Sequence, residues 1–146
     1  MTTSWVVVAS RTGARIFEHH GPGKTLRLIE SLSHPDGRRQ DRSIGTDAPG
    51  RSYESGSVQT HPLRGRESPH DHCAQVFART LGSRLATARH ASSFGRLVLV
   101  AEPHFLGFLR GHLDAPTERL VTHRISKDLA SVRADEVLAH LGGALP

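Results

Sequence analysis

Apolar residues in this chain fall into short blocks separated by turn-forming residues. Two blocks, residues 5–9 (WVVVA) and 97–101 (LVLVA), are continuously apolar, as expected of strands covered on both faces. Residues 14–18 and the residues up to about Leu32 predict two more strands, each after a glycine-containing turn. Residues 120–125 predict a fifth strand. We expect the two continuously apolar blocks to be neighbouring central strands of one sheet.

Elsewhere, apolar residues recur at three- and four-residue spacing, which predicts helices. The longest such stretch runs from about His70 to His90. A short helix is predicted to begin at Pro103, because proline suits the first helical turn. A last helix is predicted with Ser131 as its N-cap and Gly142 after its end.

The predicted order of elements is therefore βββ-α-β-α-β-α, in a single domain that spans residues 1–146. Strands that meander and then alternate with helices indicate an α/β fold with a mixed five-stranded sheet. The first three strands should be antiparallel, and helices should cover both faces. This succession is the one found in ribonuclease H-like three-layer folds.

A long polar segment, residues 33–71, interrupts this pattern. Structureless connections longer than roughly 12–15 residues are uncommon in small domains and are usually functional loops or disordered segments. Large apolar groups are almost absent between residues 36 and 68. We therefore expect a flexible loop within the domain.

The charge of the chain favours polyanionic partners, because the formal net charge is +5. Only Lys24 and Lys127 are lysines, and the arginine guanidinium binds phosphate through two hydrogen bonds and stacks on bases, which suits RNA. Four arginines of the loop are the expected phosphate contacts: Arg38, Arg39, Arg42 and Arg51. Acidic residues are as numerous as arginines in this loop, so a solvated surface loop stays an alternative. Arginine usage that reflects genome composition is another.

A second candidate contact is the edge formed by Arg110 and Lys127-Asp128. Lys127 follows the fifth predicted strand, near the carboxyl edge where open α/β sheets tend to place ligands. A local pairing of Lys127 with Asp128 in a turn is the alternative interpretation.

Residues suited to catalysis or metal binding are few. A two-metal nuclease needs several converging carboxylates, and Glu102 is the one acid placed at the end of an apolar strand. We interpret Glu102 as a helix N-terminal acid, favoured there by the helix dipole. Residues 70–73 (HDHC) are metal-ligand types, but no second ligand pair stands at a zinc-site spacing. We predict no catalytic residues, no metal and no cofactor.

The single cysteine, Cys73, excludes an internal disulfide framework and fits a reducing compartment. No apolar run approaches the roughly 20 residues needed to span a bilayer. The first apolar run is also too short for a signal peptide. We expect a cytoplasmic protein without a membrane partner.

Seven motifs spread over nearly the whole chain carry a family resemblance: residues 5–9, 14–18, 34–38 (HPDGR), 47–51 (DAPGR), 77–78, 97–110 and 127–129. They resemble the bacterial host attachment protein family, described as required for attachment to host cells. That family is similar to the middle domain of archaeal and eukaryotic peptide-chain release factors, which has a ribonuclease H-like topology. The resemblance implies a translation-related or ribosome-binding role.

The release-factor domain carries a Gly-Gly-Gln tip on the loop before its long helix, and the long loop here occupies the corresponding place. It contains Gly37-Arg38-Arg39-Gln40 instead. Two arginines cannot supply the backbone freedom of two glycines. We therefore do not expect peptidyl-tRNA hydrolysis.

These observations favour a non-enzymatic RNA- or ribosome-binding module. Two alternatives stay open. One is a protein-interaction factor related to host attachment, for which the sequence shows no export signal. The other is a hydrolase acting on RNA or an ester, opposed by the missing carboxylates and the missing Gly-Gly-Gln. A homodimer is compatible with any of these.

Overall fold

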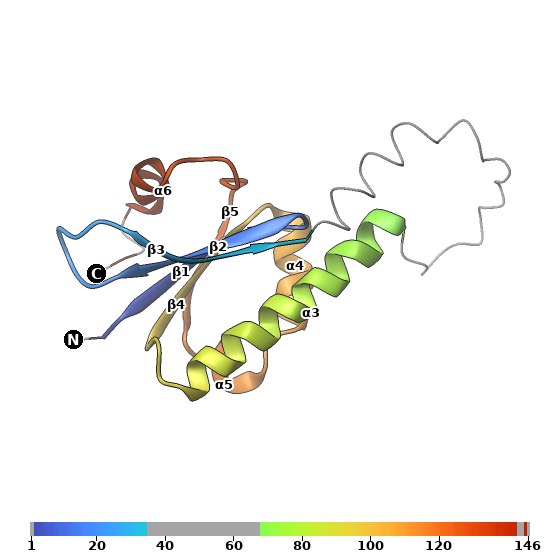
Figure 1. Cartoon of the computed structure of the whole chain (residues 1–146), viewed down its shortest axis with the longest axis horizontal. Coiled ribbons are helices and arrows are strands. Elements are labelled where there is room, and N and C mark those ends of the chain that lie inside the picture. The colour runs from blue at the N-terminus through green and yellow to red at the C-terminus, as the bar shows by residue number, and fades with distance from the viewer. Residues whose placement is uncertain (1, 35–67, 143–144, 146) are drawn as a thin grey trace, which may run out of the picture.

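A five-stranded mixed sheet forms the centre of the computed structural model, which describes residues 2–34, 68–142 and 145 (Figure 1). The strand order is β3-β2-β1-β4-β5. The strands are β1 (Ser4–Ser10), β2 (Gly13–His19), β3 (Arg27–Ser33), β4 (Arg96–Ala101) and β5 (Val121–Ser126). β2 pairs antiparallel with both β1 and β3, whereas β4 pairs parallel with β1 and with β5. The predicted α/β class and mixed five-stranded sheet are confirmed.

Helices cover both faces of this sheet, as predicted (Figure 1). One face carries α3 (Pro69–His90), α4 (Pro103–Gly111) and the short α5 (Ala115–Glu118). The opposite face carries α6 (Ala134–Leu141). The result is three layers, with the sheet in the middle.

Alternate residues of the central strands build two separate cores. Val7 of β1 and Leu99 of β4 pack under α3 and α4, while Val6 and Val98 pack under α6. All four side chains are at most 1% exposed. The prediction that the two continuously apolar strands are central neighbours is therefore confirmed, because each has a helical layer on either side.

Two details differ from the sequence-based expectation. A four-residue helix, α5, follows Asp114, whose carboxylate accepts a hydrogen bond from the Thr117 amide at 2.9 Å. The prediction of Ser131 as N-cap is wrong, because α6 begins at Ala134. Buried Leu129 anchors a turn in which its carbonyl accepts from the Val132 amide at 3.1 Å, and this turn delays the helix.

The ends of the expected loop belong to regular elements, since β3 continues through Ser33 and α3 begins at Pro69. Ser68 caps α3 by accepting a hydrogen bond from the Asp71 amide at 3.0 Å, an arrangement that contributes about 1 kcal/mol. Residues 35–67, with the predicted flexibility and all four loop arginines, lie outside the described residues.

Candidate functional site

Helices α3 and α4 approach each other closely, and a glycine makes this approach possible. A Cβ atom at Gly82 would lie 2.3 Å from the carbonyl oxygen of His112, so no other residue fits there without movement. Leu81 of α3 and Leu109 of α4 are buried in the same core. The position of α4 against α3 is thereby fixed from inside.

An open groove of about 380 Å³ follows the outer side of this contact, and we call it the α3–α4 groove. Eight residues line it: His72, Gln75, Val76, Arg79, Gly107, Phe108, Gly111 and His112. A Cβ at Gly107 or Gly111 would have no atom within 4 Å, so this side of α4 presents bare backbone to open space. The Nε2 atom of His112 lies 2.8 Å from Oε1 of Gln75, and this pair spans the two helices.

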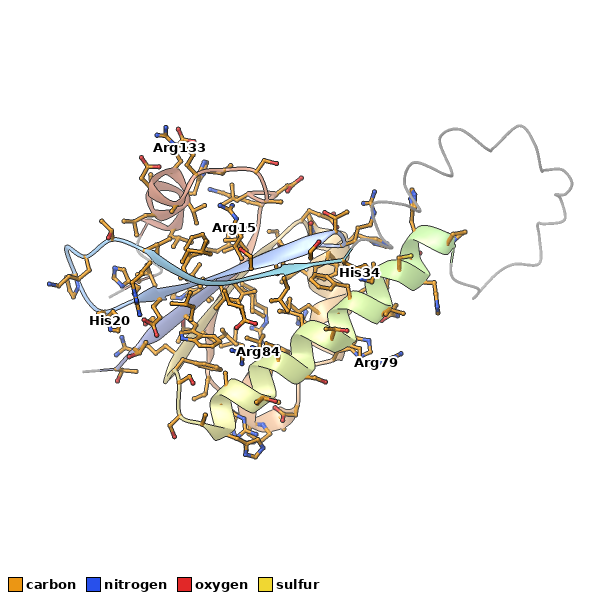
Figure 2. All side chains as sticks on the ribbon, viewed as in Figure 1. Arg15, His20, His34, Arg79, Arg84 and Arg133 are labelled. Carbon is orange, nitrogen blue, oxygen red and sulfur yellow. The ribbon has the colours of Figure 1, made fainter. Side chains whose placement is uncertain are left out.

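Arg79 gives the groove its charge. The side chain is exposed and forms no hydrogen bond or ion pair within the part of the chain that the structure describes. None of the eight lining residues is acidic. In Figure 2, Arg79 extends from α3 away from the sheet. The groove therefore holds a cation that a bound anion can reach.

Over the rest of the described surface, too, cationic side chains without a partner outnumber acidic ones without a partner. Every described carboxylate accepts a hydrogen bond or forms an ion pair, including those of Glu18, Glu30 and Asp114. In contrast, six described cationic side chains make no such contact: Lys24, Arg79, Arg96, Arg110, Arg119 and Lys127. The positive charge in excess is thus carried by side chains that are free to meet a polyanion.

Two of the predicted contact residues are described, and they are not brought together in one site. Arg110 is exposed on α4 beside Gly111, but it is not among the residues lining the groove. Lys127 is exposed directly after β5. The alternative, a local pairing of Lys127 with Asp128, is not formed among the described residues, where the Asp128 carboxylate accepts from the Ala130 amide at 3.3 Å.

A second pocket, of about 200 Å³, lies where β1 and β4 end, the place where a ribonuclease H-type centre would need carboxylates. Glu102 lines this pocket as the N-cap of α4, and its two carboxylate oxygens accept from the amides of His104 and Phe105 at 3.1 and 2.6 Å. The interpretation of Glu102 as a helix N-terminal acid is confirmed. Asp71 lies opposite and holds His104 at 2.8 Å. Within the described ranges, no group of three or more His, Cys, Asp or Glu side chains is placed to hold a metal ion.

The α3–α4 groove was not predicted from the sequence. Arg79 lies in the predicted helix from about His70 to His90, which contains other arginines, and its local sequence does not set it apart from them. The spacing of Gly107 and Gly111, one helical turn apart, was a usable signal, since glycine in a helix costs about 1 kcal/mol relative to alanine. The groove itself depends on the approach at Gly82, which joins residues far apart in sequence.

Comparison with known proteins places the chain in a family. Residues 5–141, from β1 to the end of α6, match the family described as "Protein required for attachment to host cells". The chain belongs to this host attachment family. The family membership expected from the sequence motifs is therefore confirmed.

Similarity to solved structures is weak. A solved structure described as "Archaeal protein" matches with a TM-score of 0.49 and 11% identity, over 97% of this chain and 33% of that one. The chain thus spans about a third of the length of that protein. No curated protein matches. None of the described helices is long and apolar enough to cross a membrane.

Proposed function

We propose that this host attachment family member is a non-enzymatic module that binds free RNA or the ribosome. The observation that carries this proposal is the α3–α4 groove, where Arg79 has no partner among the described residues and none of the eight lining residues is acidic. Arg38, Arg39, Arg42 and Arg51 are proposed to add phosphate contacts, with Arg110 and Lys127 as secondary ones. A cytoplasmic location is part of the same proposal.

The groove offers the two kinds of contact that single-stranded RNA uses. The guanidinium of Arg79 suits a phosphate oxygen pair. Phe108 lines the same groove and is half-buried, so part of its ring is available for stacking on a base. The open backbone at Gly107 and Gly111 lets a flat base approach α4 closely.

A ribonuclease H-like fold and a relationship to the release-factor middle domain belong to this proposal. Both are supported by the order β3-β2-β1-β4-β5, with an antiparallel first half and a parallel second half. By this proposed relationship, the long segment before α3 corresponds in sequence order to the release-factor loop. Because that segment carries Gly37-Arg38-Arg39-Gln40, we propose binding without peptidyl-tRNA hydrolysis.

The family description favours a second candidate, a protein-interaction factor for host attachment. Such a factor would bind a protein partner through its exposed surface, and its affinity for RNA would be negligible. Attachment could also be an indirect result of RNA binding in the cell. Direct measurement of RNA binding therefore separates the two candidates.

The test is cosedimentation with ribosomes and fluorescence anisotropy with a labelled single-stranded RNA, both at low salt. We expect the parent protein to bind. In the variant with Arg38, Arg39, Arg42 and Arg51 all replaced by Gln, the slope of the logarithm of the binding constant against the logarithm of the salt concentration should become shallower by roughly three units. The double variant Arg27→Gln/Arg133→Gln, which removes two exposed arginines elsewhere, should bind nearly as the parent does. No RNA or ribosome binding by the parent at low salt would contradict the proposal and favour the protein-interaction factor.

A further inference from the structure

A third pocket, of about 340 Å³, lies on the α6 side of the sheet, where β1 and β3 end and β2 begins. We call it the Arg15 pocket. The pairing of β1, β2 and β3 aligns Val8, Arg15 and Ser31 in one row across the sheet. Val8 faces the α6 core, so Arg15 occupies a position that apolar side chains fill elsewhere on this face. Figure 2 shows Arg15 pointing from β2 toward the segment between β5 and α6.

The guanidinium of Arg15 is incompletely satisfied. Its Nη2 donates to the carbonyl oxygen of Leu129 at 2.9 Å, and its Nε is buried without a hydrogen-bond partner among the described residues. No described carboxylate forms an ion pair with it, in contrast to Arg84, which binds Glu30 through two nitrogens. Burial lowers the pKa of Arg15, as expected when a charge loses water and gains no counter-ion. The side chain is half-buried, its guanidinium lies over the Phe17 ring at 5.3 Å, and a bound anion would supply the counter-ion that the described residues do not provide.

The remaining lining residues suit an anion with several oxygen atoms. None of them is acidic, and hydroxyl groups come from four elements of the chain. Ser31 and Ser131 make no side-chain hydrogen bond in the described part of the molecule, and both are exposed. Ser10 and Thr12 bond to each other at 3.0 Å and hold the turn that borders the pocket. Hydroxyl donors at several points match the tetrahedral oxygens of phosphate better than the two coplanar oxygens of a carboxylate.

We propose that the Arg15 pocket binds a phosphate monoester, with Arg15 as the anchoring cation and Ser31 and Ser131 as hydroxyl donors. The volume is at the lower end of the range for small-molecule sites and accommodates a mononucleotide-sized ligand. The phosphate belongs either to a free nucleotide or to the 5′ end of an RNA strand. The pocket and the α3–α4 groove lie on opposite faces of the sheet, so this site does not require the proposed RNA-binding groove.

The test is a titration of the full chain with inorganic phosphate and with adenosine 5′-monophosphate, at constant ionic strength set by chloride. Amide chemical shifts report the site, and the melting temperature reports stabilisation by a ligand bound only to the folded state. We expect saturable shifts at Ser31, Ser131 and Ala130. Arg15→Gln should raise the dissociation constant for phosphate by about tenfold or more. Arg15→Lys should raise it by less, because lysine keeps the positive charge but lacks the paired N–H donors of the guanidinium.

Further variants protect the test from a folding failure at Arg15. Ser131→Ala, at an exposed position, should weaken phosphate binding by about threefold. Arg133→Gln is the matched control, since it removes an exposed arginine of the same face, and Arg79→Gln removes the cation of the groove. Both should bind phosphate as the parent does, so failure of RNA binding and failure of this site are distinguishable.

Two RNA oligomers identify the source of the phosphate. Competition by a 5′-phosphorylated oligomer, but not by its 5′-hydroxyl form, would assign the pocket to an RNA end, whereas competition by the mononucleotide alone would assign it to a free nucleotide. Non-saturable shifts, equal affinity in Arg15→Gln, or displacement by acetate as readily as by phosphate would overturn the proposal.

Discussion

Two arginines of α3, five residues apart, have opposite environments. Arg84 faces β3, where its Nε and Nη2 donate to the Glu30 carboxylate at distances down to 2.6 Å, and its guanidinium lies over the ring of Trp5 at 5.7 Å. The hydrogen bonds to Glu30 raise the pKa of Arg84. Arg79 faces α4 and has no such partner among the described residues. Figure 2 shows Arg84 beside the sheet and Arg79 on the outer side of the helix.

The difference teaches that arginine content alone does not locate a binding surface. On the β3 side of α3 the charge is neutralised and contributes to stability. On the α4 side the charge is left available and contributes to the charge of an open groove. Substitutions on the two sides of α3 should therefore have different consequences, and the following predictions test that division.

The largest effect is expected at the contact that fixes the groove. Gly82→Ala should lower the free energy of unfolding by about 1–3 kcal/mol, because the new Cβ meets the His112 carbonyl and overpacks the helix contact. Gly107→Ala, on the open side of α4, should raise it by up to about 1 kcal/mol through helix propensity. Urea unfolding of both variants checks the pair, and equal destabilisation would show that α4 is not held at Gly82.

A smaller effect on the free energy of unfolding distinguishes the paired Arg84, tested through its partner Glu30, from Arg79, which has no partner among the described residues. Glu30→Gln should lower the free energy of unfolding by about 0.5–1.5 kcal/mol, because both partners are about a third exposed and solvent screens the pair. Arg79→Gln should change it by less than about 0.5 kcal/mol, as expected for an exposed side chain without a partner. Thermal unfolding compares the two. A loss at Arg79 as large as that at Glu30 would place Arg79 among the structural residues.

The smallest effect is expected in the pKa of Glu18, which pairs with Arg27. The hydrogen bond from Arg27 lowers the pKa of Glu18 below its usual 4.5, with burial acting in the opposite direction. A lowered folded-state pKa stabilises the protein above the unfolded value, and this contribution is lost as the pH falls through the folded value. NMR titration of Arg27→Gln should show the pKa of Glu18 moving upward. An unchanged pKa would mean that Arg27 does not hold the carboxylate in solution.

Much of the fold followed from local patterns, while the site did not. The continuous apolar runs at 5–9 and 97–101 identify central strands because only such strands have helices on both faces. The start of α6 was misplaced, because the turn at Leu129 is set by burial of that side chain against the sheet rather than by a capping residue. The α3–α4 groove and the Arg15 pocket each join residues from distant segments, which periodicity and composition do not reveal. Arg110 and Lys127 were predicted to share one edge, and their separation on α4 and after β5 depends on the topology.

The salt dependence of RNA binding tests the central claim most directly. The dissociation constant of a labelled single-stranded RNA should be measured between about 50 and 200 mM salt for the parent, for Arg79→Gln and for Arg133→Gln. Both variants lose one positive charge, but Arg133 is 74% exposed on the other face and already pairs with Asp135. We predict that Arg79→Gln weakens binding about tenfold at low salt and lowers the slope by about 0.7, whereas Arg133→Gln leaves the slope unchanged. Equal slopes for all three proteins would contradict the assignment of the α3–α4 groove as the RNA-binding surface.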